Sequence, residues 1–268
     1  MLKLMYITND IEVAKIAQDS GVDRIFVDLE YIGKEERQKD MDTVKSKHTI
    51  EDVKNIKGIL TKSELLVRVN PIHDNSENEI NEVIKNGADI IMLPFFKTVE
   101  EVVKFLEYVN NNTKTCLLLE TPEAVEVIDE ILGLDGIDEI HIGLNDLHLG
   151  YKKKFMFELI SDGTVEMLCN KFKKAGIKYG FGGIAALGNG VLPAEMIIKE
   201  HYRIGSTRVI LSRSFCNTKK VKDLNEIRKI FETEVRKIRK FEIDVKGYLN
   251  YFDENKKEID AIVEYIVC

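Results

Sequence analysis

Short β-type runs alternate with helical patterns along the whole chain, and this alternation limits the possible folds more than any other feature. Several runs are apolar without a break, such as Ile25–Val27 and Cys116–Leu119. Unbroken apolarity is typical of strands covered on both faces, as in a parallel sheet. The eight runs are Leu2–Ile7, Arg24–Leu29, Leu65–Asn70, Ile90–Pro94, Thr115–Glu120, Glu139–Leu144, Tyr179–Gly182 and Arg208–Leu211.

Helix-start signals lie between the runs. Thr49 precedes one helical pattern, and Ser76 with Glu79 has the spacing of a capping box at the start of another. Thr121 precedes Pro122, which is a favoured residue in a first helical turn. The sequence therefore predicts repeated βα units.

Glycines mark the return from helix to strand. Gly21, Gly87 and Gly136 each begin a Gly-X-Asp step before a β-type run, and Gly176 and Gly205 play the same part later. A glycine after a helix can adopt the left-handed conformation that ends it. These units predict an α/β fold, a (β/α)8 TIM barrel. A doubly wound open sheet is the alternative, which is weakened because no glycine-rich dinucleotide loop follows the first run.

The C-terminal residues exceed the repeat. Ile259 and Val263 belong to a spacing that suits an amphipathic helix. We predict a barrel domain over residues 1–241 and a C-terminal helical extension over residues 242–268. The extension is expected to pack on its own barrel or on a neighbouring subunit.

The net charge and the composition limit the kinds of partner that this chain can have. The chain has a formal net charge of −7 and a pI near 5.5, whereas nucleic-acid binding needs a basic face. No run approaches the ~20 apolar residues of a membrane helix. We therefore expect neither nucleic acid nor membrane as a partner. The four cysteines form no CxxC pair, and the N-terminus lacks a signal-peptide pattern, so we expect a reduced, cytoplasmic setting.

Two carboxylates follow consecutive β-type runs. Glu120 ends one run and Asp146 follows the next, 26 residues further on. If the strands are parallel neighbours, both side chains stand at the end of the barrel where barrel enzymes carry their catalytic groups. Two hard oxygen ligands there would hold a divalent cation and leave positions open for substrate. Helix capping and salt bridging are the alternatives.

Other polar residues follow strands at the same predicted end. Asp28 and Glu30 follow the second run, and Arg68 lies in the third. A desolvated arginine needs an anionic partner, either one of these carboxylates or a substrate carboxylate or enolate oxygen. Asn145 either positions a ligand or caps a helix. The turn at residues 181–183 either binds an anion through backbone amides or is only a tight turn.

Five motifs occur in a fixed order. They are VDLE at 27–30 followed by Lys34 and Arg37, RVNP at 68–71, GADIIMLP at 87–94, LLLETPEAV at 117–125 and IHIGLNDL at 140–147. In this order and spacing the chain resembles the HpcH/HpaI aldolase and citrate lyase β-subunit superfamily over roughly residues 20–217. The VDLE motif with its downstream basic residues is closer to the citrate lyase branch.

The resemblance implies a metal-dependent barrel, usually oligomeric, that makes or breaks carbon–carbon bonds. The family's metal-binding carboxylates fall on Glu120 and Asp146, and its arginine that holds the keto or enolate oxygen falls on Arg68. The implied ion is Mg²⁺, or Mn²⁺ or Co²⁺. The candidate residues are thus Arg68, Glu30 and Asp28 for catalysis, Arg68, Asn145, Gly143 and Leu144 for substrate binding, and Glu120 and Asp146 for the metal.

One departure concerns the group that transfers protons. The 2-keto-3-deoxy acid aldolases carry an acidic residue followed by His after the second strand, whereas Glu30 is followed here by Tyr31. The base is therefore unassigned, with Glu30, Tyr31 or a metal-bound water as substitutes.

The sequence predicts an aldolase-type lyase (EC 4.1, an aldehyde-lyase or oxo-acid-lyase) that depends on a divalent metal and forms the enolate of a pyruvate-like 2-keto acid. It is expected to be a homo-oligomer. One alternative is a citrate-lyase-like enzyme acting on an acyl-CoA thioester. Another is a catalytically inactive barrel that serves as a ligand-binding or assembly subunit.

Overall fold

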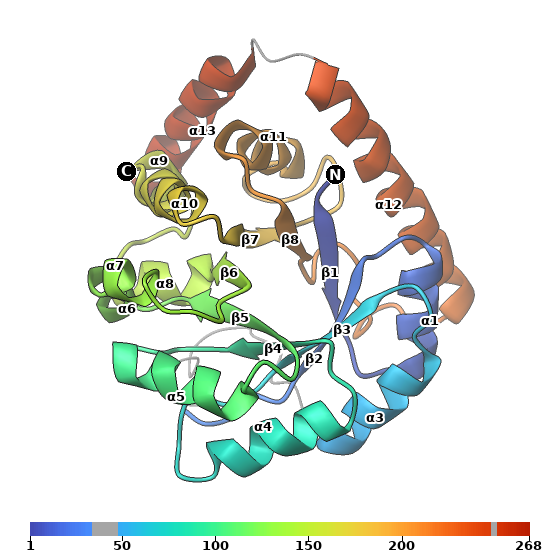
Figure 1. Cartoon of the computed structure of the whole chain (residues 1–268). Helices are drawn as coiled ribbons and strands as arrows, with labels where there is room; N and C mark the ends of the chain where they lie inside the picture. The colour runs from blue at the N-terminus through green and yellow to red at the C-terminus, as the bar shows by residue number, and fades with distance from the viewer. Residues whose placement is uncertain (34–47, 248–250) are drawn as a thin grey trace.

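Eight parallel strands form a closed barrel in the order of the sequence, β1 to β8 (Figure 1). This computed structural model describes residues 1–33, 48–247 and 251–268. The predicted (β/α)8 TIM barrel and its C-terminal helices are confirmed, and the open sheet is excluded. The strands are β1 Lys3–Ile7, β2 Arg24–Asp28, β3 Glu64–Arg68, β4 Ile90–Leu93, β5 Lys114–Leu119, β6 Glu139–Ile142, β7 Lys178–Ile184 and β8 Arg208–Leu211.

Helices surround the barrel, and most of the predicted caps are present. Thr49 forms a capping box, and the Thr121 side chain accepts a hydrogen bond from the backbone N–H of Ala124. Thr98 forms a further capping box at the start of another helix. The helices are α1 Ile11–Asp19, α3 Ile50–Ile59, α4 Ser76–Lys85, α5 Val99–Val109, α6 Pro122–Glu126, α7 Ile128–Ile131, α8 Leu144–Gly150, α9 Glu158–Ser161, α10 Thr164–Lys174, α11 Ala194–Ile204, α12 Leu224–Gly247 and α13 Phe252–Val267.

The capping box predicted at Ser76 is wrong. Ser76 is the first residue of α4, and Asn75 occupies the cap position without a side-chain hydrogen bond. The Ser76 hydroxyl instead accepts a hydrogen bond from the backbone N–H of His73 at 2.8 Å. The hydroxyl therefore orders the turn that leads into the helix.

Strand parity divides the core into two parts. Along β5, Leu117 and Leu119 pack with helix residues in the larger cluster, whereas Cys116 and Leu118 pack with Met5 and other residues of the smaller one. Alternate residues of a strand point to opposite faces, so the smaller cluster fills the interior of the barrel. The barrel is thus a packed core with its polar groups left to its two ends.

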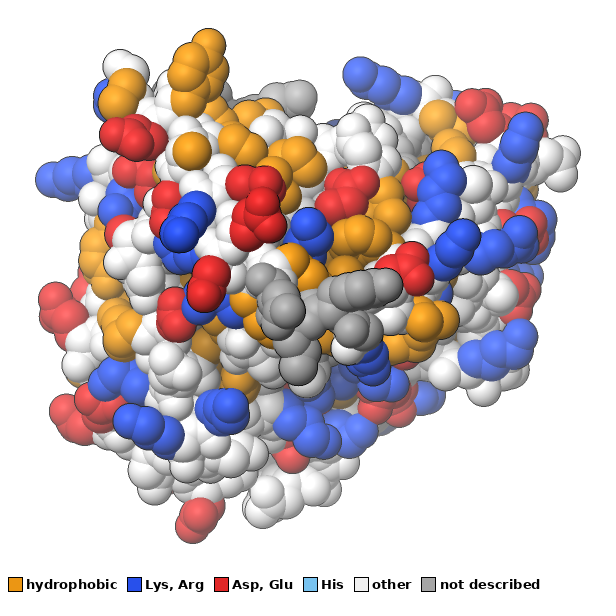
Figure 2. Space-filling view, turned by 90° about the horizontal axis from the view of Figure 1, so that it is seen from above, with side chains coloured by type: hydrophobic (Ala, Val, Ile, Leu, Met, Phe, Trp, Pro, Cys, Tyr) orange, Lys and Arg blue, Asp and Glu red, His pale blue; other side chains and the backbone are white. Residues whose placement is uncertain are grey.

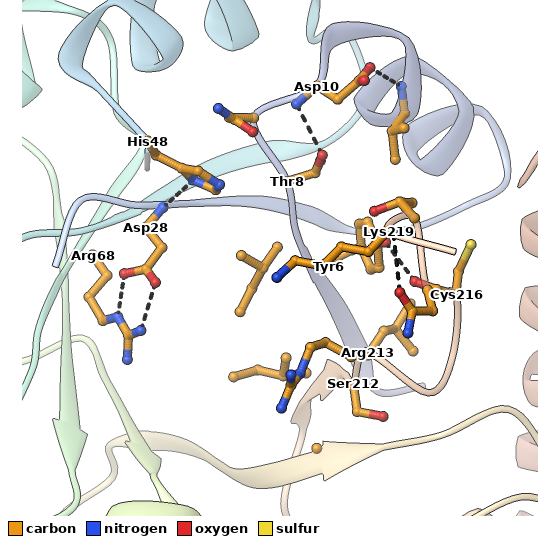
Figure 3. Close-up of a pocket in the computed structure, with 18 of the residues that line it drawn as sticks. Tyr6, Thr8, Asp10, Asp28, His48, Arg68, Ser212, Arg213, Cys216 and Lys219 are labelled. Carbon is orange, nitrogen blue, oxygen red and sulfur yellow. Dashed lines mark hydrogen bonds and ion pairs between the residues drawn. The ribbon is translucent and has the colours of Figure 1, made fainter. Parts of the chain in front are cut away.

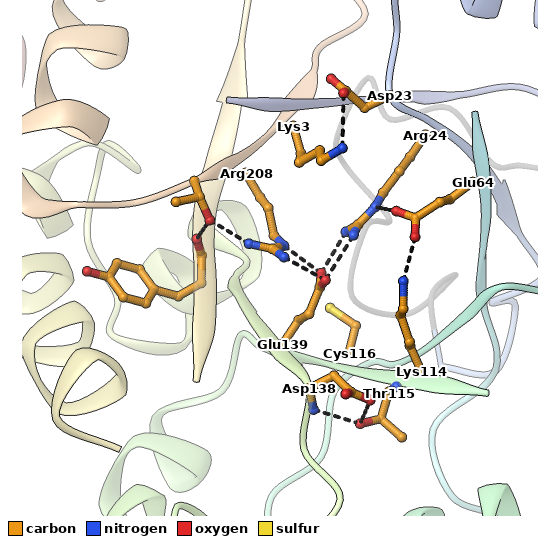
Figure 4. Close-up of polar contacts among 12 residues, drawn as sticks. Lys3, Asp23, Arg24, Glu64, Lys114, Thr115, Cys116, Asp138, Glu139 and Arg208 are labelled. Atoms are coloured by element: carbon orange, nitrogen blue, oxygen red, sulfur yellow. Dashed lines mark hydrogen bonds and ion pairs between the residues drawn. The ribbon is translucent and has the colours of Figure 1, made fainter. Parts of the chain in front are cut away.

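A buried ionic network closes the N-terminal end of the barrel (Figure 4). The guanidinium groups of Arg24 and Arg208 both donate to the Glu139 carboxylate, at 2.6–2.8 Å. These residues begin β2, β8 and β6, respectively. Three strands far apart in sequence are thereby tied together at the end opposite to the predicted site.

The C-terminal helices pack on their own barrel. α12 lies against α1, and α13 lies against α9 and α11 (Figure 1). Ile259 and Val263 are buried, as the amphipathic pattern predicts. The predicted start of the extension at residue 242 falls inside α12, which continues to Gly247.

Charged side chains of both signs are interspersed on the face seen from above the view of Figure 1, with hydrophobic side chains between them (Figure 2). Ile243 and Tyr265, on α12 and α13, are among the exposed large hydrophobic residues of the molecule. None of the described helices has the length and apolarity needed to cross a membrane.

Strand β7 is longer than predicted. It continues to Ile184, with an irregular register between Gly180 and Gly183, so the turn predicted at residues 181–183 is part of the strand. Gly182 has a positive φ of 52°, a conformation that glycine adopts most readily. This irregularity allows the strand to bend without ending.

Candidate active site

Arg68 and Asp28 form the best-defined ion pair at the C-terminal end of the barrel (Figure 3). They are the last residues of β3 and β2 and lie opposite each other in the parallel register. Arg68 Nε and Nη2 donate to the two Asp28 carboxylate oxygens at 2.8 and 2.9 Å. Such a bidentate pair fixes the plane of the guanidinium.

A second carboxylate supports the same arginine. Arg68 Nη2 lies 3.2 Å from Glu30 Oε2, and both side chains are largely shielded from solvent. Burial alone would lower the pKa of Arg68, but the negative charges of Asp28 and Glu30 outweigh it and raise that pKa. Nη1 donates no hydrogen bond to a described residue, and Arg68 lines the main cavity. The arginine is therefore both paired internally and placed to meet a ligand.

Glu120 follows β5 and is buried beside the end of β6. Its Oε1 accepts a hydrogen bond from the backbone N–H of Phe95 at 3.2 Å. A Cβ added at Gly143 would lie 2.7 Å from Glu120 Oε2, closer than side-chain atoms can approach. Gly143 thus leaves the space that the carboxylate occupies. The substrate-binding role predicted for Gly143 remains a prediction, and its packing explains the glycine independently.

Asp146 lies in the first turn of α8, where a helix favours negative charge. Its Oδ1 accepts a hydrogen bond from Asn145 Nδ2 at 3.0 Å. Asp146 and Glu120 line one cavity of about 510 Å³. The two predicted metal carboxylates, which follow the neighbouring strands β5 and β6, therefore line a common cavity.

The donor set fits a divalent cation. Two carboxylates are the hard oxygen donors that Mg²⁺ uses together with substrate and water, and Gly143 leaves room for the Glu120 carboxylate beside the end of β6. In the residues that the structure describes, no three His, Cys, Asp or Glu side chains gather as a complete cage. The remaining ligands of a cation held by Glu120 and Asp146 would come from the substrate and from water.

The main cavity joins the arginine to one of the two metal candidates, Glu120. It has a volume of about 730 Å³ and is lined by Arg68, Asp28 and Glu120 together with Gly143, Leu144 and Asn145. Glu120 lines both cavities and Asp146 only the smaller one. Glu30 reaches Arg68 without lining either cavity. Among the described residues, Glu30 bears on the cavity through its ion pair with Arg68.

The structure adds two histidines that sequence reasoning missed. His48 Nδ1 accepts a hydrogen bond from the Asp28 backbone N–H at 2.9 Å, and its side chain lines the main cavity (Figure 3). An accepting Nδ1 means that the neutral ring carries its proton on Nε2. No local pattern predicts this contact, because 20 residues separate the partners.

His141 lines the same cavity from within the barrel. It is 1% exposed, and its Nε2 lies 3.1 Å from the carbonyl oxygen of Gly182. Burial lowers the pKa of His141 to about 4, so the ring is neutral near pH 7. The alternation of side chains along a strand could have indicated His141, because residues 139 and 141 both point to the inner face of β6.

Some sequence predictions cannot be placed. Lys34 and Arg37, which follow the VDLE motif, lie outside the described residues. Tyr31 is 68% exposed, and its backbone N–H donates to Asn70 Oδ1 at 2.9 Å. Tyr31 lines neither cavity. The structure therefore gives no support to Tyr31 as a substitute for the proton-transferring histidine of the aldolases.

Comparison with known proteins places this site in a family. The family model described as HpcH/HpaI aldolase/citrate lyase matches residues 4–179, more than half of the chain. The chain belongs to the HpcH/HpaI aldolase/citrate lyase family. The resemblance identified from the sequence motifs is thereby confirmed, and with it membership of a family of lyases. No curated protein matches the chain.

Solved structures of the HpcH/HpaI family show the same fold. An HpcH/HpaI aldolase from Desulfitobacterium hafniense DCB-2 is 14% identical, with a TM-score of 0.63 over 85% of this chain and 93% of that one. A family protein from Burkholderia cenocepacia J2315 is also 14% identical, with a TM-score of 0.65 over 85% of this chain and 94% of that one. At this identity the likeness supports the barrel and not a substrate.

Proposed function

We propose that this HpcH/HpaI family member is a carbon–carbon lyase that depends on a divalent cation and forms the enolate of a pyruvate-like 2-keto acid. The observation that carries the proposal is the Arg68 guanidinium, oriented by Asp28 and Glu30 at the wall of a cavity that Glu120 also lines. A fixed positive charge stabilises a developing oxyanion without reorganising during the reaction.

The chain's own residues have separable roles in this proposal. Asp28 and Glu30 keep Arg68 charged and in plane, so that Nη1 can donate to the keto oxygen as it gains negative charge. Asn145 orients the Asp146 carboxylate through the 3.0 Å hydrogen bond. Mg²⁺, or Mn²⁺ or Co²⁺, held by Glu120 and Asp146 would supply Lewis-acid polarisation of the carbonyl group.

The side chain that transfers the proton is expected among the histidines and carboxylates that line the main cavity. His48 lines the cavity beside Asp28 with its Nε2 protonated in the neutral ring. In that form its Nε2–H can donate a hydrogen bond to the substrate. The homo-oligomeric state and the cytoplasmic location expected from the sequence remain predictions.

Metal removal and add-back test the proposal. The protein is treated with EDTA and assayed for retro-aldol release of pyruvate from a panel of 4-hydroxy-2-keto acids, before and after Mg²⁺ or Mn²⁺ is returned. Activity should disappear and then recover. Glu120→Gln should lose activity at least about 100-fold, whereas Glu130→Gln, on the surface of α7 and outside both cavities, should match the wild type. Full activity of the metal-free protein would reject the proposal.

A further inference from the structure

The main cavity is larger than a three-carbon acid requires. Its volume of about 730 Å³ lies in the range of about 300–1,000 Å³ that proteins use for drug-sized ligands. Arg68 and Glu120 occupy only one part of its wall. Much of the remainder is formed by the segment that follows β8, residues 212–222. In the proposed function, no part of the pyruvate-like acid reaches this part of the cavity.

Three cationic residues of that segment line the cavity. They are Arg213, Lys219 and Lys222. Figure 3 shows the side chains of Arg213 and Lys219 pointing into the cavity from the side opposite Arg68. Lys222 Nζ donates to the Thr218 carbonyl oxygen at 2.9 Å. The Lys219 ammonium forms no ion pair with any described residue, so its charge is available to a ligand.

The segment is held in place by its own contacts. Phe215 and Cys216 are buried, and the Tyr6 hydroxyl donates to the Cys216 carbonyl oxygen at 3.1 Å. The Lys219 backbone N–H donates to Asn217 Oδ1 at 3.1 Å. These contacts anchor the base of the segment to β1 and order the turn that carries Lys219. The backbone from which these cationic side chains extend is thus ordered by the fold.

Two acidic side chains of the described residues line the main cavity near this segment, and both are engaged by other groups. Asp10 lines the same part of the cavity, but its Oδ1 caps α1 by accepting the backbone N–H groups of Glu12 and Val13 at 2.9 and 3.0 Å. Asp28 is bound to Arg68. Neither carboxylate pairs with Lys219. Ser212 and Thr218 add hydroxyl groups to the same wall, so this end of the cavity combines positive charge with neutral donors.

We propose that this end of the cavity binds a phosphoryl group carried by the substrate, at a distance from the keto acid that Arg68 receives. A phosphoryl group has up to two negative charges and three acceptor oxygens, which suits several cations and hydroxyls better than one carboxylate does. Barrel enzymes frequently bind phosphate at the loops after strands 7 and 8. The inference rests on the proposed function, because it takes the same cavity as the substrate site.

Calorimetric titration of the full chain with two probes tests the inference. Coenzyme A carries a diphosphate and a phosphomonoester, and ribose 5-phosphate carries a phosphomonoester alone. At least one should bind the wild type, and its identity separates a thioester substrate from a phosphorylated aldehyde. Lys219→Met should weaken that binding about tenfold through loss of a charge-assisted contact. The matched control is Lys220→Met, an exposed neighbour that does not line the cavity, and it should bind as the wild type does.

Two outcomes would overturn the inference: no binding of either probe, or equal affinity of the wild type and Lys219→Met for the probe that binds. The titration does not depend on catalysis. If the protein binds a phosphate probe through Lys219 but has no lyase activity, the proposed function is rejected and the phosphoryl site is retained. Lyase activity in a protein that binds neither phosphate probe would reject the phosphoryl site and leave the proposed function standing.

Discussion

Replacing Glu139 by glutamine should be among the most destabilising single changes in this protein. The Glu139 side chain is 4% exposed and accepts four hydrogen bonds, two from Arg24 and two from Arg208. The two arginine side chains are 2% and 7% exposed. Glutamine keeps the shape but leaves two buried positive charges facing each other. Breaking a buried ion pair in this way costs about 3–5 kcal/mol.

The pKa of Glu139 gives a second estimate of the same energy. Burial alone would raise this pKa, but the hydrogen bonds and charges of Arg24 and Arg208 outweigh it and lower the pKa from 4.5 to about 2. A difference of about 2.5 pKa units corresponds to about 3 kcal/mol. Because the folded-state pKa is depressed, this stabilisation is present above pH 4.5 and is lost as the pH falls towards 2.

Urea unfolding followed by far-ultraviolet circular dichroism measures the effect. The chain has no tryptophan, so the backbone signal is the suitable probe. At pH 7 the free energy of unfolding of Glu139→Gln should be about 3 kcal/mol or more below that of the wild type, and the gap should narrow as the pH approaches 2.

A matched control uses Glu64. Its side chain is 31% exposed and pairs with Arg24 and Lys114 near the same end of the barrel (Figure 4). Because water screens this partly exposed pair, Glu64→Gln should cost about 1 kcal/mol or less. If Glu139→Gln were no more destabilising than Glu64→Gln, the buried network would not be what holds this end of the barrel closed.

Two further changes probe the opposite end of the barrel. Gly143→Ala would place a Cβ 2.7 Å from Glu120 Oε2 and should weaken Mn²⁺ binding about tenfold by calorimetry. Gly58→Ala, where nothing lies within 4 Å of the added Cβ, should leave that affinity unchanged, and equal affinities for all three proteins would contradict the metal assignment. Asp28→Asn removes one charge that orients Arg68 and should reduce kcat at least about tenfold. Wild-type kcat in this variant would show that the pair is only structural.

The fold could be predicted because each βα unit carries its own signals. Unbroken apolar runs such as Cys116–Leu119 marked the strands, and Thr49 and Thr121 marked helix starts that the structure confirms. Neighbouring strands also brought Asp28 and Arg68 within reach of each other, because a parallel barrel sets consecutive strand ends side by side. Local chemistry therefore determined both the architecture and this ion pair.

Contacts between distant residues could not be predicted in the same way. Arg24 and Glu139 are 115 residues apart, and only closure of the barrel brings them together. His48 reaches Asp28 across 20 residues without any pattern that marks the contact. Lys219 lines the main cavity because the segment after β8 is anchored to Tyr6, a contact between residues far apart in the sequence. Each of these positions follows from tertiary packing, which a single sequence does not display.

Deuterium exchange into pyruvate tests the proposed enolate site most directly, because it requires no knowledge of the second substrate. Proton NMR follows the methyl signal of pyruvate in D2O with protein and Mg²⁺. Wild-type protein should exchange the methyl protons only when the metal is present, and Arg68→Ala should slow that exchange at least about 100-fold. Wild-type exchange no faster than in buffer with Mg²⁺, or equal exchange in Arg68→Ala, would contradict an enolate stabilised at this site.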